Sequence, residues 1–336
     1  MARVQNWVPV VEAATRAPSI HNTQPWRFTA APDRLEVFLD TSRGLPTLDP
    51  THRQQVISCG VAVEFALVAL RSAGHEAEVE VGGAEVGGAG DDDHLATVRV
   101  TGPHEPTGAD QALATAIVER HTRRAPFLPH AVPDELLGQL QEAAGPYGVW
   151  VQQVSETDAE LVLAHLLDRA ERAEQSDPAY RAELESWLRT DPDAPDGVPV
   201  TAVPADDPAA RPTNWTVRDF LVGRRTRQPA APVADDDPPP PVERPAVVLL
   251  GTAGDDRPAW VQAGRALGRV LLVLTAAGMA ASPLTQALDW PATRTRMRVD
   301  LSLVGHPQMI MRIGWSSAQP TRTGRRPVAE VLRTVD

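Results

Sequence analysis

Ala17-Pro-Ser-Ile-His-Asn-Thr-Gln-Pro-Trp-Arg-Phe28 is the stretch of sequence that decides the fold. It reads as a proline-bounded loop that leads into a strand, and its short polar residues are Ser19, Asn22 and Gln24. Such a loop can offer backbone N–H groups and side-chain amides to a planar heterocycle or to a phosphate. The same residue types also form ordinary helix-to-strand turns. The residues alone support both interpretations equally.

A run of basic residues, Arg120-His-Thr-Arg-Arg124, is a second candidate for anion binding. Guanidinium groups together with a hydroxyl suit a dianionic phosphate better than neutral groups would. An arginine run at the end of a helix is also favoured by the helix dipole and by solvent, without any ligand. The run is therefore a candidate phosphate site with an alternative structural explanation.

The composition fits a soluble globular protein, with 336 residues of which 42% are hydrophobic. The formal net charge of -12 argues against a general affinity for nucleic acid or anionic membranes. No apolar run reaches the roughly 20 residues needed to span a bilayer, and the first residues lack the apolar core of a signal peptide. We therefore expect a cytoplasmic protein with no nucleic-acid and no membrane partner. Cys59 is the only cysteine, so an internal disulfide is excluded and a buried structural thiol is expected.

Apolar periodicity and turn residues divide the chain into helices and strands. Residues 190–245 are rich in Pro, Asp and Ala, and they are expected to form an irregular excursion. Helices are expected over 7–16, 54–72, 110–119, 133–144, 158–174, 179–188, 260–277 and 328–333, and strands over 35–39, 76–81, 95–100, 149–154, 246–250 and 309–314.

Four pairs of segments resemble each other in the same order, which indicates an internal duplication. The longest pair is Gly60–Gly74 and Gly264–Gly278, two apolar helices of equal length that both end in Ala-Gly. A short strand follows each of them, Thr97–Thr101 in the first half and Ile310–Gly314 in the second. The remaining pairs precede the helices: Glu12-Ala-Ala with Glu142-Ala-Ala, and Trp26-Arg-Phe28 with Trp150-Val-Gln152. Each match alone is weak, but their common order favours duplication over chance.

The first motif closely resembles the PSxxNxQPW motif of the nitroreductase superfamily, where it lines the FMN site. In the same superfamily an RRSxR-type signature holds the FMN phosphate, and Arg120, Thr122 and Arg124 match it. His21 lies in the loop as a candidate proton donor, although we expect a surface or packing role for it. The resemblance implies FMN as the cofactor, with loop contacts from Pro18, Ser19, Ile20, Asn22 and Gln24.

Two segments near the C-terminus resemble further parts of that FMN site. Gly278–Thr285 is similar to the segment after the long helix whose backbone meets the flavin ring, which implies contacts from Ser282, Pro283 and Leu284. Thr323-Gly-Arg-Arg-Pro327 is similar to the closing segment that adds basic groups at the phosphate. The resemblance makes both Arg325 and Arg326 candidates and does not choose between them.

The order of the motifs departs from that of an ordinary nitroreductase. There, the arginine signature precedes the Pro-Ser loop, and a homodimer forms two shared FMN sites. Here the first half, 1–108, has the loop, and the second half, 109–336, has the arginines. The chain thus resembles the Acg-type nitroreductase-like proteins, which implies a duplicated α+β fold of antiparallel-rich sheets flanked by helices. It also implies one complete FMN site between two fused halves, in a monomer with internal pseudo-two-fold symmetry.

In Acg-type proteins a segment of the second half covers the flavin as a lid, and the excursion at about 156–245 is its candidate here. Two functions stay open. The first is an oxidoreductase that moves hydride from NAD(P)H or another reductant to an unidentified small acceptor, in general or specialised metabolism. The second is a non-catalytic FMN-sequestering or flavin-sensing protein whose lid prevents turnover. The sequence has no GxGxxG after a strand, so any NAD(P)H would stack directly on the flavin.

Other charged clusters are weaker candidates. Gly223-Arg-Arg-Thr-Arg-Gln228 contains Arg225 and Arg227, which offer an alternative phosphate site. We rank the run at 120–124 above it, because a predicted helix precedes the earlier run and a Pro-rich stretch follows the later one. Asp91-Asp-Asp-His94 and Asp235-Asp-Asp237 resemble metal sites only in composition, so solvated loops and no metal are expected there.

Overall fold

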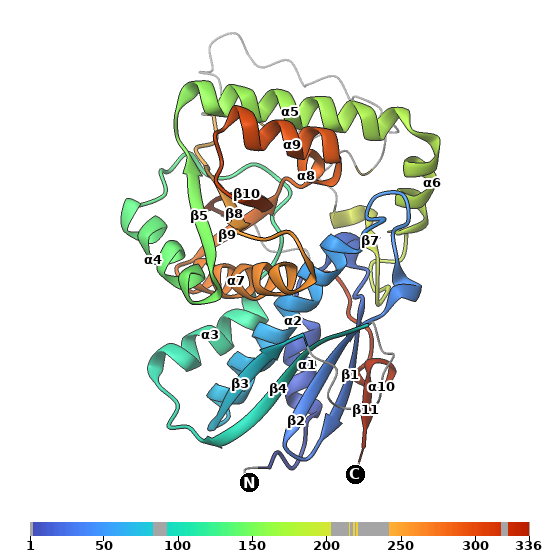
Figure 1. Ribbon diagram of the computed structural model, residues 1–336, viewed down its shortest axis with the longest axis vertical. Helices are drawn as coiled ribbons and strands as arrows, with labels where there is room; N and C mark the ends of the chain where they lie inside the picture. The colour runs from blue at the N-terminus through green and yellow to red at the C-terminus, as the bar shows by residue number, and fades with distance from the viewer. Residues whose placement is uncertain are drawn as a thin grey trace, which may run out of the picture.

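The computed structural model describes residues 3–82, 93–202, 215, 218, 220, 242–316 and 322–335 of the chain. Within these residues, two sheets enclose two long helices at the centre of the molecule (Figure 1). The expected α+β combination of antiparallel sheets and flanking helices is confirmed. Helix and sheet bounds agree with the sequence expectations to within a few residues in most places.

Sheet A has the strand order β11-β1-β2-β4-β3. Its strands pair antiparallel, except that β11 runs parallel to β1. Leu35, Val37 and Leu39 lie at every second position of β2 and are fully buried, which gives the sheet its apolar face. The strands are β1 (Trp26–Ala31), β2 (Arg34–Leu39), β3 (His75–Val81), β4 (His94–Pro103) and β11 (Leu332–Thr334).

Sheet B has the order β5-β8-β10-β9, with antiparallel pairing throughout. Every residue of β8 is buried, as expected for a short continuous apolar run that lies between two layers of helices. A separate pair of two-residue strands, β6 (Leu188–Arg189) and β7 (Val198–Pro199), lies beside the first half. The strands of sheet B are β5 (Val149–Val154), β8 (Ala246–Thr252), β9 (Met279–Pro283) and β10 (His306–Trp315).

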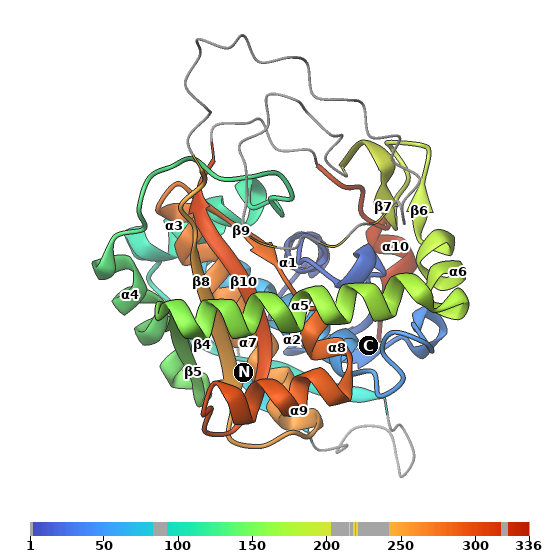
Figure 2. The same cartoon turned by 90° about the horizontal axis from the view of Figure 1, so that it is seen from above.

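The helices form one layer between the sheets and one layer outside sheet B. In Figure 1, α2 and α7 lie between the sheets, and α5 crosses the far side of sheet B with α8 and α9 beneath it. Figure 2 shows how α5 spans the molecule from sheet B towards α6. The helices are α1 (Val8–Thr15), α2 (Arg53–Ser72), α3 (Gly108–Glu119), α4 (Asp134–Ala144), α5 (Thr157–Ser176), α6 (Pro178–Ser186), α7 (Arg257–Ala276), α8 (Gln286–Asp289), α9 (Pro291–Asp300) and α10 (Val328–Val331).

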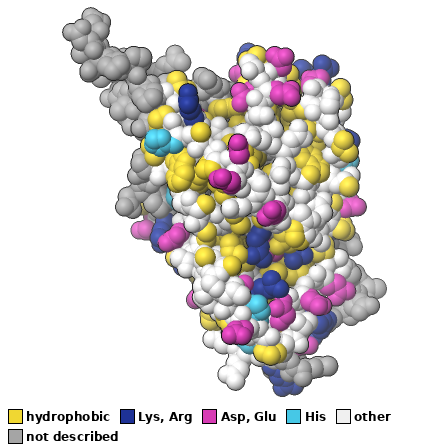
Figure 3. All heavy atoms as spheres, turned by 90° about the vertical axis from the view of Figure 1, so that its left-hand side faces the viewer, with side chains coloured by type: hydrophobic (Ala, Val, Ile, Leu, Met, Phe, Trp, Pro, Cys, Tyr) yellow, Lys and Arg dark blue, Asp and Glu magenta, His cyan; other side chains and the backbone are white. Residues whose placement is uncertain are grey.

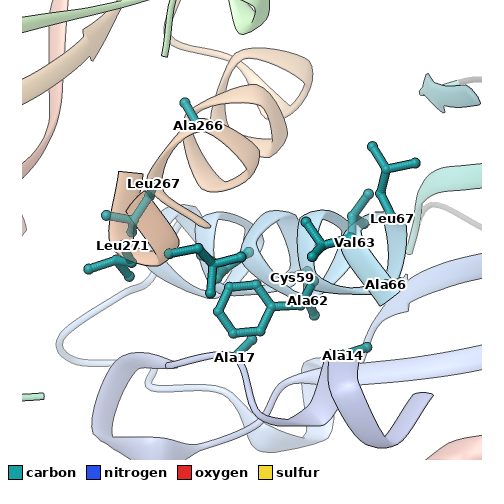
Figure 4. Close-up of a cluster of buried hydrophobic side chains, with 14 of the residues drawn as sticks. Ala14, Ala17, Cys59, Ala62, Val63, Ala66, Leu67, Ala266, Leu267 and Leu271 are labelled. Carbon is teal, nitrogen blue, oxygen red and sulfur yellow. The ribbon is translucent and has the colours of Figure 1, made fainter. Parts of the chain in front are cut away.

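The two central helices touch through a pair of glycines. A β-carbon placed on Gly60 would lie 2.4 Å from the carbonyl oxygen of Val261, and one on Gly264 would lie 2.1 Å from that of Ile57. The contact is reciprocal, because each glycine faces the residue three positions before the other. Small side chains let α1 approach α2 in the same way, and Figure 4 shows Ala14 with the α2 and α7 residues of this core. Backbone contact of this closeness requires glycine at both positions.

The two sheets share one strand order, and some of the elements around them follow one another in the same order along the chain. Within each sheet, β1, β2, β4 and β3 occupy the same successive places as β5, β8, β10 and β9. The long helix follows the second strand in both cases, as α2 after β2 and as α7 after β8. A helix also precedes the first strand in both cases, as α1 before β1 and as α4 before β5. The segments matched in the sequence therefore lie at corresponding places in the structure.

The structure corrects several sequence expectations. The helix expected over 328–333 ends at Val331, and Leu332–Thr334 forms β11 because it pairs with β1. Strand β9 and helices α8 and α9 were not expected at all. Most of the 190–245 excursion lies outside the described residues, as do Arg225, Arg227 and the acidic run at 235–237. Within the part that is described, no group of His, Cys, Asp and Glu is arranged to hold a metal.

Helix α2 is long and apolar enough to cross a membrane by length and composition, contrary to expectation. In the structure 83% of its most apolar window is buried inside the protein, so α2 is a core helix. Cys59 is buried on α2 as expected, and burial raises the pKa of its thiol. On the face seen in Figure 3, acidic and basic side chains are interspersed among apolar ones.

Candidate functional site

A cleft opens between the loop before β1 and the segments that follow α3 and α7. The space between its walls, with the open mouth included, is about 1000 Å³. One side is formed by the 18–21 loop and the first turns of α2, and the other by β9, β10 and α7. Most of its wall is apolar, with Ile20, Ile57, Val61, Leu267, Leu271, Met309 and Met311 among the lining residues.

The loop on one side of the cleft has an unusual backbone. His21, Asn22 and Gln24 all have positive φ, at 45°, 55° and 50°, a conformation that residues with a β-carbon rarely adopt. Two hydroxyls support it: Gln24 donates its backbone N–H to Ser19 Oγ at 2.9 Å, and Ile20 donates to Ser58 Oγ at 3.2 Å. Clusters of this kind of backbone strain occur at functional sites, where the surrounding structure maintains them.

The two amides of the loop bind neighbouring chain segments. Asn22 Nδ2 donates to the carbonyl of Gly197 at 3.0 Å, and Gln24 Nε2 donates to that of Pro195 at 2.7 Å. Gln24 Oε1 accepts from the backbone N–H of Arg326 at 2.8 Å. Asn22 borders the polar end of the cleft, whereas Gln24 does not line it. These amides therefore hold the loop against the segment before β7 and against the C-terminal segment.

A second cavity, which shares Ser19, Arg120, Thr122 and Arg124 with the cleft and forms its polar end, is strongly cationic. Arg16, Arg120, Arg124, Arg322 and Arg325 line it together with Ser19, Thr122 and Thr323. Among the described residues, no carboxylate pairs with any of these five arginines, and the Nε of Arg120 is buried without a partner. Burial and the neighbouring Arg325 and Arg124 lower the pKa of Arg120 to about 9, and burial lowers that of Arg124 to about 10. An anion would relieve this repulsion.

The path of the chain after α3 explains which residues of the basic run face the cleft. The helix ends at Glu119, and Arg120 is already extended, with φ -57° and ψ 130°. The segment then pairs with β9, since Thr122 bridges Ala281 in parallel and Arg123 N–H donates to the Ala281 carbonyl at 2.8 Å. Arg120, Thr122 and Arg124 line the cleft at alternate positions of this extended segment, and His121 lines it as well. The guanidinium of Arg123 instead donates to two backbone carbonyls.

The structure brings most of the predicted site residues together. Pro18, Ser19, Ile20, Arg120, Thr122, Arg124, Ser282 and Pro283 line the cleft, and Asn22 and Arg325 border its cationic end. Leu284 is instead fully buried in the core beneath α5. Arg326 turns away from the cleft, with its guanidinium 3.7 Å from Asp40 and 3.4 Å from Glu330. Arg325 rather than Arg326 is the closing-segment arginine that faces the cavity.

Several residues that line the cleft were not identified as site residues from the sequence. Gln54 and Ser58 lie on the first turns of α2, four residues apart in an otherwise apolar helix, and that spacing is a signal that could have identified them. His21, for which a surface or packing role was expected, is buried. Arg218 and Phe220 reach the cleft from the excursion, and no pattern in the surrounding sequence marks them. Phe220 lies against the Arg124 guanidinium, 5.4 Å from ring centroid to Cζ.

A buried network of charges lies next to the cleft. Arg218 donates to Glu174 at 3.0 Å and to Asp289 at 2.8 Å, so two carboxylates share one guanidinium. Burial raises the pKa of Glu174 to about 8, and Asp289 and Glu171 add to the shift. Arg53 lies 3.5 Å from the other oxygen of Asp289. Arg218 stays protonated, because the surrounding acidic groups raise its pKa.

Glu174 should make the stability of the protein fall as pH rises. Its folded-state pKa of about 8 lies above the ordinary glutamate pKa of 4.5, so the folded state holds the proton more tightly. The free energy of unfolding should then decrease between these two values, by at most about 1.4 kcal/mol per pH unit for one group. Glu174→Gln keeps an acceptor for Arg218 and should flatten this decline in denaturant titrations. Glu142→Gln, on the exposed face of α4, is the control, and an equal decline in Glu174→Gln would contradict the assignment.

Comparison with known proteins places the chain in a family. It is 36% identical over 335 residues to the Mycobacterium tuberculosis protein named "Putative NAD(P)H nitroreductase Rv3131", with 96% of this chain and 90% of that protein covered. It is 29% identical over 325 residues to the acg nitroreductase of the same organism, with 96% and 93% covered. No family model matches the chain. The FMN-dependent nitroreductase NfnB of Mycobacterium smegmatis, solved with NADPH, aligns at 20% identity and a TM-score of 0.43, over 68% of this chain and 100% of that one. The 36% identity along nearly the whole chain shows that this protein belongs to the nitroreductase superfamily, in its Acg-like branch.

Proposed function

We propose that this chain binds one FMN in the cleft and acts as an FMN-dependent oxidoreductase that takes hydride from NAD(P)H. The proposal rests on one observation: an apolar cleft and a cationic cavity adjoin each other. Ser19, Arg120, Thr122 and Arg124 line both of them. A planar ring with a dianionic phosphate has the matching distribution of polarity. When bound, FMN supplies a ring that accepts and donates hydride, which the side chains of the protein cannot do.

The residues present fit FMN on the chemistry of their donors. The guanidinium groups of Arg120 and Arg124, which have no carboxylate partner among the described residues, and the hydroxyl of Thr122 would hold the phosphate, with Arg325 behind them. The orphaned Nε of Arg120 is a buried donor that such an anion would satisfy. The apolar wall formed by the 18–20 loop, α2 and β9 would hold the ring and exclude water from it.

Internal duplication of a nitroreductase-like unit explains why one chain would form a complete site. The reciprocal Gly60–Gly264 contact and the identical strand orders support halves at 1–108 and 109–336 related by a pseudo-two-fold axis. The axis passes between the two glycines, so a single chain already contains the paired arrangement. We infer that it functions as a monomer.

At the position that this axis would relate to the cleft, charged side chains pair with one another. Arg265 on α7 stands there in place of Val61 on α2, and the Tyr147 ring lies over its guanidinium at 4.9 Å. Glu64 is fully buried and pairs with Arg265 at 3.6 Å and with Arg269 at 2.7 Å. The cations on this side are therefore neutralised internally, unlike those at Arg120. This contrast supports one FMN per chain rather than two.

The described parts of the excursion support its role as a lid over the cleft. Arg218 and Phe220 line the cleft directly. Pro195 and Gly197 accept hydrogen bonds from the loop amides, and Asp196 pairs with Arg43. A segment that covers the flavin would select which reductants and acceptors reach it. This feature also favours the alternative function, a non-catalytic FMN-sequestering or flavin-sensing protein.

Anaerobic addition of NADPH to the purified protein tests the proposed function. We expect a yellow protein whose visible flavin absorbance bleaches within seconds, because an open face above the ring would admit nicotinamide. Dithionite serves as the control, since it shows that the bound flavin can be reduced at all. A flavin that bleaches with dithionite but not with NADPH or NADH would favour the sequestering function. A colourless protein that also fails to take up added FMN would overturn both.

A further inference from the structure

His21 is a buried histidine in the wall of the cleft, and its ring orientation is constrained from two sides. The residue is 6% exposed and lines the apolar part of the cleft. Its backbone has φ 45° and ψ 22°, which fixes the direction in which the side chain leaves the loop. The Phe220 ring packs edge-on against it, with centroids 5.8 Å apart.

A hydrogen bond from Arg218 decides which ring nitrogen of His21 carries the proton. Arg218 Nη1 lies 3.2 Å from His21 Nε2, and a guanidinium can only donate. Nε2 is therefore the acceptor, and in the neutral ring the proton must be on Nδ1. Burial lowers the pKa of His21 well below its usual value, and the positive charges of Arg218 and Arg124 lower it further. Within the described residues, the buried Nδ1 has no partner.

Arg218 is itself held in place by acceptors on two other helices. Its Nη2 donates to Glu174 on α5 and to Asp289 on α8, while Nη1 points at His21. Because three acceptors fix one planar group, the guanidinium cannot rotate away from the imidazole without breaking buried ion pairs. The orientation of Nδ1–H therefore depends on side chains that do not themselves line the cleft.

We propose that His21 is a fixed neutral hydrogen-bond donor whose Nδ1–H binds an acceptor atom of the planar molecule in the cleft, with Arg218 as the positioning residue. This inference rests on the proposed function, since it takes that molecule to be FMN or the electron acceptor stacked on it. Leaving a buried donor unsatisfied is costly, so the site favours a ligand with a carbonyl or ring nitrogen at this point.

The same geometry makes His21 a poor general acid. Loss of the Nδ1 proton from a neutral ring would leave an imidazolate anion, and the guanidinium at Nε2 does not give up its proton to replace it. The proton that accompanies hydride in the reduction of an acceptor must come from another source, such as solvent. The role considered for His21 from the sequence, that of proton donor, is thereby replaced by that of hydrogen-bond donor.

Nitrogen-15 NMR of histidine-labelled protein tests the tautomer and the contact directly. His21→Phe identifies the His21 signals among those of the nine histidines. We expect protonated Nδ1 and unprotonated Nε2 in the FMN-free protein near neutral pH. Two additions then test the contact: FMN added to the FMN-free protein, and 1,4-naphthoquinone added to the FMN-loaded protein. The addition that shifts the Nδ1 resonance identifies the molecule that accepts the hydrogen bond. His104, which pairs with Glu76 and Asp110 outside the cleft, should stay unchanged.

Two substitutions add a binding measurement to the spectra. His21→Phe keeps a ring against Phe220 but removes the hydrogen-bond donor. It should weaken the binding of the partner, either FMN or naphthoquinone on the FMN-loaded protein, about tenfold, which corresponds to the loss of one hydrogen bond. His21→Gln retains both an acceptor for Arg218 and an N–H donor, and it should restore most of this loss. Rescue by glutamine separates a donor role from a purely structural one.

The outcomes separate this inference from the proposed function. A yellow, reducible protein whose His21 is protonated on Nε2, or whose Nδ1 responds to neither FMN nor naphthoquinone, overturns the inference alone. Equal affinities in the wild type, His21→Phe and His21→Gln would overturn it as well. A folded protein that binds no FMN overturns both the proposed function and the inference.

Discussion

Replacing Arg120 and Arg124 together by glutamine should give a folded protein without flavin colour. The two guanidinium groups face the cationic end of the cleft and have no carboxylate partner among the described residues. A hydrogen bond to a charged group contributes about 1.5–3 kcal/mol, so losing two should weaken FMN binding by about 100- to 10,000-fold. Titration of FMN-free protein with FMN, followed by quenching of flavin fluorescence, measures the change.

The stability of the same variant distinguishes a lost anion site from a lost fold. Burial lowers the pKa values of both Arg120 and Arg124, and repulsion from Arg325 and Arg124 lowers that of Arg120 further, so their charges destabilise the FMN-free protein. The double variant should therefore unfold, without FMN, at a temperature equal to or above that of the wild type. Arg123→Gln is the matched control in the same run, because the Arg123 guanidinium binds backbone carbonyls instead. Normal FMN affinity in the double variant would show that the phosphate lies elsewhere.

A site residue could be predicted from the sequence where it belongs to a recognisable local motif. Ser19 and Arg120 belong to contiguous motifs of unusual composition, and both reach the cleft. Arg325 and Arg326 are adjacent and chemically identical, so only the path of the chain separates them. Arg325 donates to Asn22 Oδ1 at 3.2 Å, while Arg326 turns to Asp40. Sequence reasoning could not resolve that choice, because one step along an extended segment reverses the side-chain direction.

The fold shows the same division between local and long-range signals. Helices α2 and α7 were predicted because each is a long apolar helix followed by a glycine, Gly74 or Gly278, whose positive φ suits the turn after a helix. The three residues of β11 form a strand only because they pair with β1, a contact across about 300 residues of sequence that no local pattern records. Arg218 escaped for a similar reason, since its partners lie on α5, α8 and the loop before β1.

Gly264→Ala should be the most damaging small substitution in the core. Its β-carbon would lie 2.1 Å from the carbonyl oxygen of Ile57 and 2.8 Å from the α-carbon of Gly60, and both are backbone atoms that cannot rotate away. Separating α2 from α7 should lower the free energy of unfolding by about 3 kcal/mol, the upper end for overpacked cores. It should also weaken FMN binding, because both helices contribute walls to the cleft. Chemical denaturation and FMN titration measure the two effects.

A matched glycine in another helix shows whether the damage comes from the contact or from the loss of glycine. A β-carbon on Gly138 in α4 would meet no atom within 4 Å, so Gly138→Ala should stabilise that helix by about 0.5–1 kcal/mol. Gly60→Ala, whose β-carbon would meet the carbonyl of Val261 at 2.4 Å, should instead reproduce the loss seen in Gly264→Ala. Matching losses at Gly60 and Gly264, with none at Gly138, would indicate that the reciprocal helix contact holds the two halves and their shared cleft together. If Gly264→Ala unfolded like the wild type, that contact could not be what fixes the geometry of the cleft.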